Sequence, residues 1–209
     1  MTTHHDHDLM TSHQGSAGHH DAGGGLSAMA ASATLHCLTG CAIGEIVGLL
    51  IGTAAGLSNA TTIALSIALA FGFGYTLSAM PLLRAGLDLR RVLTVVLAAD
   101  TLSILTMEVV DNLVIAVIPG AMNAGLVNLV FWGSMALSLV VAFAAAFPVN
   151  RWLLGRGKGH ALTHEFHGGD QRPEGWRRML PAVSSATLAV GIATFILGGA
   201  VVSLADHLG

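Results

Sequence analysis

Two cysteines and a glutamate recur at intervals of four residues in the first long apolar stretch of the chain. They are Cys37, Cys41 and Glu45, and His36 directly precedes the first cysteine. Residues four apart lie on the same face of an α-helix, one turn from each other. Two thiolates on one face suit a soft metal ion such as Cu(I), and a nearby imidazole or carboxylate would extend the ligand set. The alternative is that the cysteines serve only as small buried apolar residues.

A later apolar stretch carries three acidic residues and a methionine at helical spacing. Asp100, Met107, Glu108 and Asp111 share one broad face of the predicted helix. A carboxylate inside a lipid bilayer is costly unless it is paired, protonated or hydrated, so such residues are candidates for a functional site. The alternative is that the acids form hydrogen bonds between helices and that Asp111 lies near the membrane surface.

Five apolar stretches are long enough to position these side chains across a membrane. The chain of 209 residues is 53% hydrophobic and 10% charged, with a mean hydropathy of +0.70. This leaves too little polar surface for a soluble globule, and runs of roughly 20 apolar residues predict transmembrane helices. The expected spans are 33–55, 61–83, 92–118, 124–149 and 182–205. We therefore expect an all-α, multi-pass membrane protein with five helices.

The basic residues indicate how the spans are oriented. All nine lysines and arginines fall between the second and third spans or between the fourth and fifth. Because basic loops are retained on the cytoplasmic side, we expect the N-terminus inside and the C-terminus outside. If the first and third spans run in the same direction, Cys41 and Asp100 each lie about eight residues beyond the start of their helix. A column of ligands from the cysteines to Asp111 would then suit a cation pathway or a metal site.

Two extramembrane segments are rich in histidine. We expect residues 1–30 to form a disordered cytoplasmic tail, residues 31–149 a four-helix core, and residues 182–209 the fifth helix and the C-terminus. The intervening loop, 150–181, contains His160, His164 and His167, which would align as a secondary metal site if that loop is helical. The alternative in both segments is a solvated surface.

Small residues form a second stripe on the first span. Gly40, Gly44, Gly48 and Gly52 recur every four residues, which lets another helix approach closely. The spacing does not say whether that helix belongs to the same chain or to a second copy. We favour a homo-oligomer formed through this stripe.

Three segments together resemble a bacterial membrane family known as domain of unknown function 4396. They are HCLTGCAIGEIVGLLIG, ADTLSILTMEVVDN and FPVNRWLLGRGKGHALTH. The resemblance covers nearly all of the chain after about residue 30. It implies a helical membrane domain in the bacterial inner membrane, in the company of copper-handling proteins, and it carries no settled activity.

The leading functional hypothesis is a transporter or channel for a transition metal, with copper favoured and zinc as the alternative. Two other classes stay open, namely a membrane oxidoreductase or metalloenzyme with a carboxylate-rich metal site, and a metal-sensing scaffold subunit. A proton-coupled carrier of organic solutes is also compatible with buried acids. The chain has neither a P-loop nor the HExxH pattern of metalloproteases, and nothing in it points to nucleic acid.

Overall fold

Five long helices make up the computed structural model, which describes residues 20–156, 175–181 and 183–208. The long helices are α1 (His20–Ala54), α2 (Asn59–Arg84), α3 (Leu89–Val117), α4 (Leu129–Gly155) and α6 (Ser185–Leu208), and two short 3-10 helices are η1 (Ala121–Asn123) and η2 (Gly175–Met179). Each long helix is apolar and long enough to cross a membrane, and the described residues contain no strand. The prediction of an all-helical protein with five spans is confirmed.

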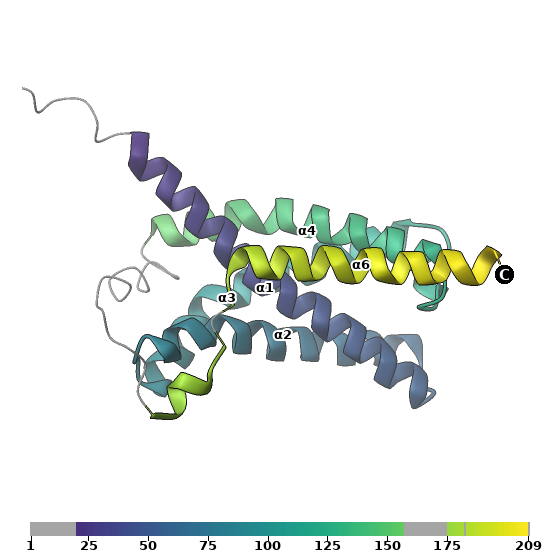
Figure 1. Cartoon of the computed structure of the whole chain (residues 1–209), viewed down its shortest axis with the longest axis horizontal. Helices are drawn as coiled ribbons and strands as arrows, with labels where there is room; N and C mark the ends of the chain where they lie inside the picture. Colours follow the sequence, from purple (N-terminus) through teal and green to yellow (C-terminus); the bar gives the residue numbers. More distant parts are fainter. Residues whose placement is uncertain (1–19, 157–174, 182, 209) are drawn as a thin grey trace, which may run out of the picture.

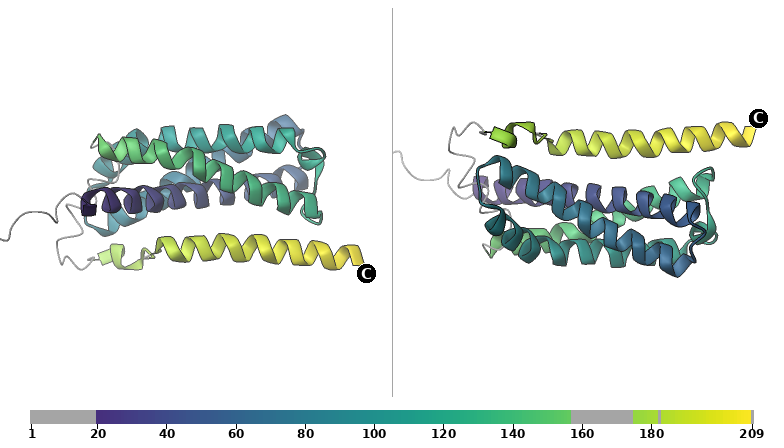
Figure 2. Two further views of the ribbon diagram at one scale, coloured as in Figure 1. Left: turned by 90° about the horizontal axis from the view of Figure 1, so that it is seen from above. Right: turned by 90° about the horizontal axis from the view of Figure 1, so that it is seen from below.

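The first four helices form a bundle, and the fifth lies along its flank. Figure 1 shows α1 crossing the bundle obliquely between α2 and α4, and Figure 2 shows α6 set apart from the other four in two views. The α1–α2 and α3–α4 pairs make the most extensive contacts. Because each pair is joined by a short connection, its two helices run antiparallel.

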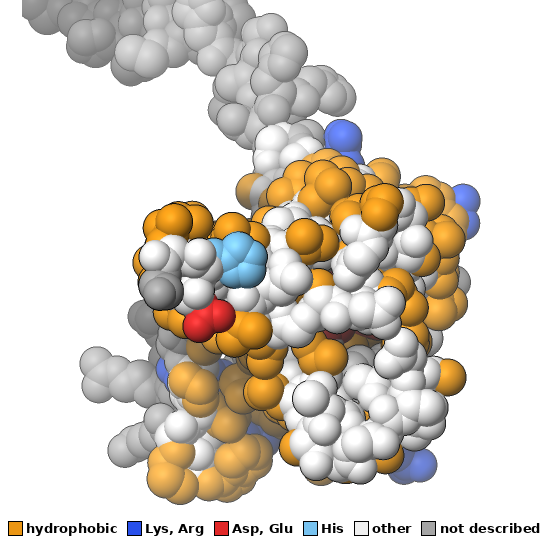
Figure 3. Space-filling view, turned by 90° about the vertical axis from the view of Figure 1, so that its right-hand side faces the viewer, with side chains coloured by type: hydrophobic (Ala, Val, Ile, Leu, Met, Phe, Trp, Pro, Cys, Tyr) orange, Lys and Arg blue, Asp and Glu red, His pale blue; other side chains and the backbone are white. Residues whose placement is uncertain are grey.

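The two ends of the bundle differ in charge. Every described arginine side chain belongs to one end, which we call the arginine end: Arg84 closes α2, Arg90 and Arg91 begin α3, and Arg151 and Arg156 lie in or just after the last turns of α4, with Arg177 nearby in η2. The other end holds the α1–α2 turn and the α3–α4 connection, and we call it the turn end. Viewed from the turn end, the surface is mostly hydrophobic and uncharged, with basic groups only at its margin (Figure 3).

Capping residues set the helix starts at these connections. The side chains of Ser58, Asp88 and Asn128 accept hydrogen bonds from backbone N–H groups in the first turns of α2, α3 and α4. Gly56 has a φ of 64° in the α1–α2 turn, a left-handed conformation that other residues rarely adopt.

Three expected boundaries need correction. Helix α1 begins at His20, so the prediction of a disordered tail over residues 1–30 is wrong from residue 20 onwards, and Ala30 is fully buried. Helix α4 begins at Leu129 instead of residue 124, because Asn128 supplies the cap. It also continues to Gly155, so the expected loop 150–181 starts later. Residues 1–19, together with His160, His164 and His167, lie outside the described residues.

The glycine stripe of α1 packs against α2 of the same chain. A Cβ atom placed on Gly40 or Gly44 would lie 2.4 Å from Gly74 Cα or 2.2 Å from the backbone nitrogen of Ala70. Gly48 and Gly52 lie just as close to Ser66 and Thr62, mainly to their side chains. Helices α1 and α2 are therefore in close contact from Gly40 to Gly52. This face has no room for a second copy, so the expected route to a homo-oligomer is wrong, although oligomerisation itself stays a prediction.

Candidate functional site

Helix α3 is polar on its inner face and apolar on its outer face. Asp100, Ser103, Glu108 and Asp111 are buried within the bundle. The outer face carries leucine and valine side chains that are about half exposed: Leu93, Leu97, Leu105, Val109 and Leu113. A helix at the surface of a soluble protein buries its apolar side chains and exposes its polar ones, and α3 does the opposite. This is expected when lipid is the solvent, because polar groups then form hydrogen bonds inside the protein.

The polar face of α3 meets the thiol and carboxylate stripe of α1. The Cys37 thiol lies close to Asp100 and Ser103, and its sulfur is 3.8 Å from the Ser78 hydroxyl of α2. One turn further along α1, Cys41 lies beside Glu108.

The last member of the stripe, Glu45, lies against Asp111 and near Glu108. Helices α1 and α3 run in the same direction, so these contacts follow one another along the bundle axis. We call this row the acid–thiol column, and its members are Cys37, Cys41, Glu45, Asp100, Glu108 and Asp111.

The column joins the residues expected from the sequence but in a shifted register. Equal distances from the expected helix starts would have placed Cys41 beside Asp100. In the structure Asp100 lies beside Cys37, about one turn closer to the arginine end. The count was wrong because α1 begins at His20, well before the expected start at residue 33.

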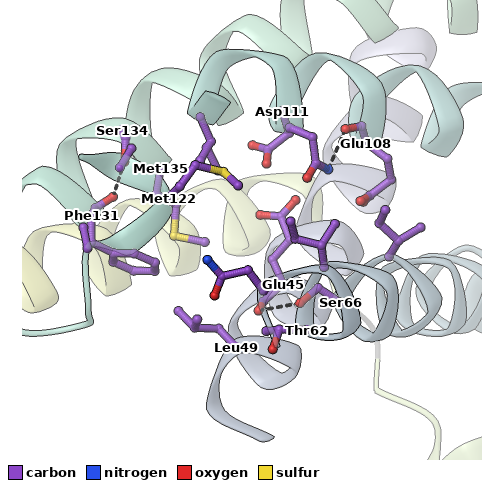
Figure 4. Close-up of a pocket in the computed structure, with 17 residues that line it drawn as sticks. Glu45, Leu49, Thr62, Ser66, Glu108, Asp111, Met122, Phe131, Ser134 and Met135 are labelled. Atoms are coloured by element: carbon purple, nitrogen blue, oxygen red, sulfur yellow. Dashed lines mark hydrogen bonds between the residues drawn. The ribbon is translucent and has the colours of Figure 1, made fainter. Parts of the chain in front are cut away.

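The acids of the column line a cavity near the turn end. The cavity has a volume of about 140 Å³ and is bounded by α1, α2, α3, α4 and the α3–α4 connection. Figure 4 shows the carboxyl groups of Glu45, Glu108 and Asp111 gathered at one side of it, with Met122 and Met135 on the other. A space of this volume accommodates a few water molecules, each of which occupies roughly 30 Å³ in the liquid.

These carboxyl groups are poorly satisfied within the protein. The neighbour of the Glu108 carboxyl group is the Cys41 thiol, a weak donor, and neither oxygen of Glu108 has a well-formed hydrogen bond. One oxygen of Glu45 and one of Asp111 also lack a hydrogen-bond partner. Glu108 and Asp111 are each only 3% exposed. The described residues that line the cavity include no lysine, arginine or histidine. A buried carboxylate without such a partner is stabilised by a bound cation or by a proton.

Two other residues that were predicted to belong to the site, Met107 and His36, lie outside the acid–thiol column. The Met107 side chain is buried in the core cluster that also contains Cys37 and Cys41. His36 points away from the column, because successive residues of a helix are about 100° apart. Its Nδ1 atom lies 2.8 Å from the backbone oxygen of Ser32, so the ring is directed along its own helix.

The column does not form a single compact metal centre. Among the residues that the structure describes, no three histidine, cysteine or acidic side chains converge closely enough to hold one ion. Both cysteines are free thiols. The donor groups are instead spread along the bundle axis, with the carboxyl groups of Glu45, Glu108 and Asp111 near the turn end and the two thiols deeper inside.

Several polar residues of the site were not singled out from the sequence. Helix α2 contributes Asn59, Thr62 and Ser66 to the cavity, and α4 contributes Ser134. Ser138, one turn further along α4, lies beside Asp111. The four-residue interval between Ser134 and Ser138 is a signal of one polar face, but hydroxyl groups are common in transmembrane helices and the signal is weak without the structure.

Comparison with known proteins gives one match. The model of a family described as domain of unknown function (DUF4396) matches residues 27–159, which is more than half of the chain. No curated protein and no solved structure matches. The matched region contains most of α1, all of α2, α3 and α4 and the whole acid–thiol column, and it ends before α6.

Proposed function

Because the chain belongs to the DUF4396 family, whose function is unknown, we propose its activity from the site alone. We propose that the protein is a membrane transporter or channel for a transition-metal cation, with copper as the first candidate and zinc as the alternative. The observation that carries this proposal is the group of three carboxyl groups, from α1 and α3, at the wall of a cavity whose described lining has no basic side chain.

Electrostatics favours a cation as the occupant of this cavity. Like charges in a medium of low dielectric constant repel strongly, so Glu45, Glu108 and Asp111 cannot all be ionised without a positive partner. A cation that enters from the turn end would supply that partner. The amide and hydroxyl groups of Asn59, Thr62 and Ser66 add neutral oxygen atoms to the same lining.

The sulfur atoms favour a soft metal over an alkali or alkaline-earth ion. Met122 and Met135 line the cavity, and Cys41 lies directly beside Glu108. Thiolate and thioether sulfur atoms prefer Cu(I), and thiolates also bind Zn(II). An ion that leaves the carboxylates would therefore meet a thiol ligand next.

The arrangement along an axis favours passage of an ion over a fixed centre. A metalloenzyme usually surrounds its metal with three or four ligands in a defined geometry. Here the donors follow one another over about three turns of α1, from Cys37 to Glu45. A metal-centred membrane enzyme and a metal-sensing scaffold remain the alternative hypotheses. We place the protein in the inner membrane of a bacterium, with copper-handling proteins as its partners.

Metal flux into proteoliposomes tests the proposal. Purified protein is reconstituted with a metal-sensitive dye inside the vesicles, and Cu(I), Zn(II), Co(II) and Ni(II) are added outside. We expect flux of at least one of these ions, and we expect Asp111→Asn and Glu45→Gln to lower it about tenfold or more, the loss that corresponds to roughly 1.4 kcal/mol.

The matched control is Asp206→Asn, at the exposed tip of α6 and outside the lining of the cavity. This variant should retain the flux of the unmodified protein. The proposal fails if the unmodified protein passes none of the four ions, or if Asp111→Asn and Asp206→Asn are indistinguishable.

A further inference from the structure

The bundle is hollow towards the turn end and filled towards the arginine end. The cavity reaches inward from the turn end to Glu45, Glu108 and Asp111. Beyond them the column continues through side chains that are almost completely inaccessible, including Cys37 at 0% and Asp100 at 2% exposure. The column is thus open to one side of the membrane and closed to the other.

The closed half is mainly apolar, but it also contains several buried polar side chains. Thr34, Ser78, Ser103 and Asn150 are all buried there, together with Cys37. A permanent plug inside a membrane protein is most stable when it is apolar, because each buried polar group costs free energy unless it is hydrogen-bonded. Buried hydroxyl, amide and thiol groups in line with the cavity suit a pathway that is closed in this conformation and hydrated in another.

One hydrogen bond joins α1 to α4 across this half. Asn150 Nδ2 donates to Thr34 Oγ1 over 2.8 Å, and Thr34 in turn donates to the backbone oxygen of Ala30 over 2.7 Å. Thr34 lies one turn before Cys37 on α1, on the side of the arginine end. This contact therefore lies between Cys37 and the arginine end, where α1 packs against α4.

Both helices opposite α1 have a proline close to the closed end. Pro148 lies two residues before Asn150 within α4, and Pro81 lies three residues after Ser78 within α2. A proline inside a helix removes one backbone hydrogen bond and weakens the helix at that point. The last turns of each helix can therefore bend at the proline while the remainder of the helix stays folded.

We propose that the Thr34–Asn150 hydrogen bond is the latch of a gate at the arginine end, and that the structure is the state open to the turn end. This hydrogen bond breaks when the end of α4 bends at Pro148. The bend exposes Cys37 and Asp100 to the opposite side of the membrane. What passes through the gate rests on the proposed function. The gate itself is detectable without any metal.

The native cysteines can serve as labelling sites for the test, because Cys37 and Cys41 are the only cysteines of the chain. In a Cys41→Ser background, the rate at which a membrane-impermeant maleimide labels Cys37 is measured with the reagent added to one side at a time. We expect Thr34→Val and Asn150→Ala each to raise labelling from the arginine side about fivefold, the effect of losing one ordinary hydrogen bond from the closed state.

Thr39→Val is the matched control. The Thr39 hydroxyl donates only to the backbone oxygen of Leu35 in its own helix, over 2.7 Å, so its loss should leave labelling unchanged. A protein that is merely unfolded would label equally from both sides, which distinguishes misfolding from gating. The proposal is overturned if folded Thr34→Val and Asn150→Ala proteins label no faster than Thr39→Val from the arginine side. Faster one-sided labelling, together with a lack of metal flux through the protein that keeps Cys41, would support the gate and refute the proposed function.

Discussion

Glu108 is the residue at which stability and function conflict most directly. It is 3% exposed, lies on the wall of the cavity, and has only the weak S–H donor of Cys41 beside its carboxyl group. A protein under selection for stability alone would place an apolar side chain at such a position. Under the proposed function, the Glu108 carboxyl group serves to bind the cation.

Replacing Glu108 by methionine should separate these two properties. We expect Glu108→Met to raise the free energy of unfolding in detergent by about 1–3 kcal/mol, the usual cost of an unsatisfied buried polar group, and to abolish metal flux. Thermal unfolding and the proteoliposome assay measure the two effects. Asp206→Leu, at an exposed site, should change neither. A Glu108→Met protein that is less stable than the unmodified protein would show that the carboxyl group has a partner inside the fold.

The column residues could be identified from the sequence, but the sequence did not show which acid lies beside which thiol. Acids and thiols within apolar stretches stand out, because lipid makes them costly and few other residues there are ionisable. Which acid faces which thiol depends on the axial offset of α1 against α3, and a difference of one turn changes every pair. The hydroxyl groups from α2 and α4 gave no comparable signal, since serine and threonine satisfy themselves on their own helix, as Ser134 does with the Val130 oxygen at 2.7 Å.

Among the helices, the packing of α1 against α2 is the contact that most restricts their arrangement. Four glycines of α1 place its backbone against α2, and at Gly44 a Cβ would come within 2.2 Å of a backbone atom that cannot move independently. The glycine interval was visible in the sequence. The choice of α2 as the partner followed from the short turn between the helices, and it could not be distinguished from a second copy without the structure.

A pair of glycine substitutions tests this constraint. We expect Gly44→Ala to destabilise the protein by about 1–3 kcal/mol, because an added methyl group overpacks the interface. Gly72→Ala, on α2, should cost nothing, because a Cβ at Gly72 meets nothing within 4 Å and alanine favours the helix. Unfolding titrations of the two variants in the same detergent provide the measurement. Equal stability of both would mean that α1 and α2 can separate freely.

The helix boundaries were predicted less well than the number of helices. Hydropathy located all five spans, yet α1 extends back to His20 through residues rich in glycine, alanine and serine. Such residues are not apolar enough to belong to a predicted span. Packing of Ala30 and Ala33 against the bundle stabilises the helix there instead, and the sequence gives no direct indication of that packing.

At the scale of the whole molecule, the arginine end distinguishes one end of the bundle from the other, because the described arginine side chains lie there. Arg84 donates to the backbone oxygen of Leu180, and Arg177 donates to that of Leu87 over 3.3 Å, so these side chains also tie the segment before α6 to the α2–α3 connection. Trp152 and Trp176 are about half exposed at the same end, as expected of residues at a membrane surface. We therefore maintain the prediction that this end faces the cytoplasm.

Thiol labelling of intact cells checks the orientation. We expect Leu208→Cys, at the exposed end of α6, to react with a membrane-impermeant maleimide added outside. We expect Trp176→Cys, at the arginine end, to react only after the cells are permeabilised. The native cysteines are buried and should add little background. The opposite pattern would invert the topology and with it the direction from which the cavity fills.

The glycine contact also determines how the molecule can deform. Helices α1 and α2 are in close contact from Gly40 to Gly52, so we expect them to move together. Helices α3 and α4 form the other hairpin. The contacts of Glu45 with Asp111 and of Cys41 with Glu108 cross from the first hairpin to the second. The column residues therefore lie at the interface between the two hairpins, so any tilt of one hairpin against the other would change the distances between them.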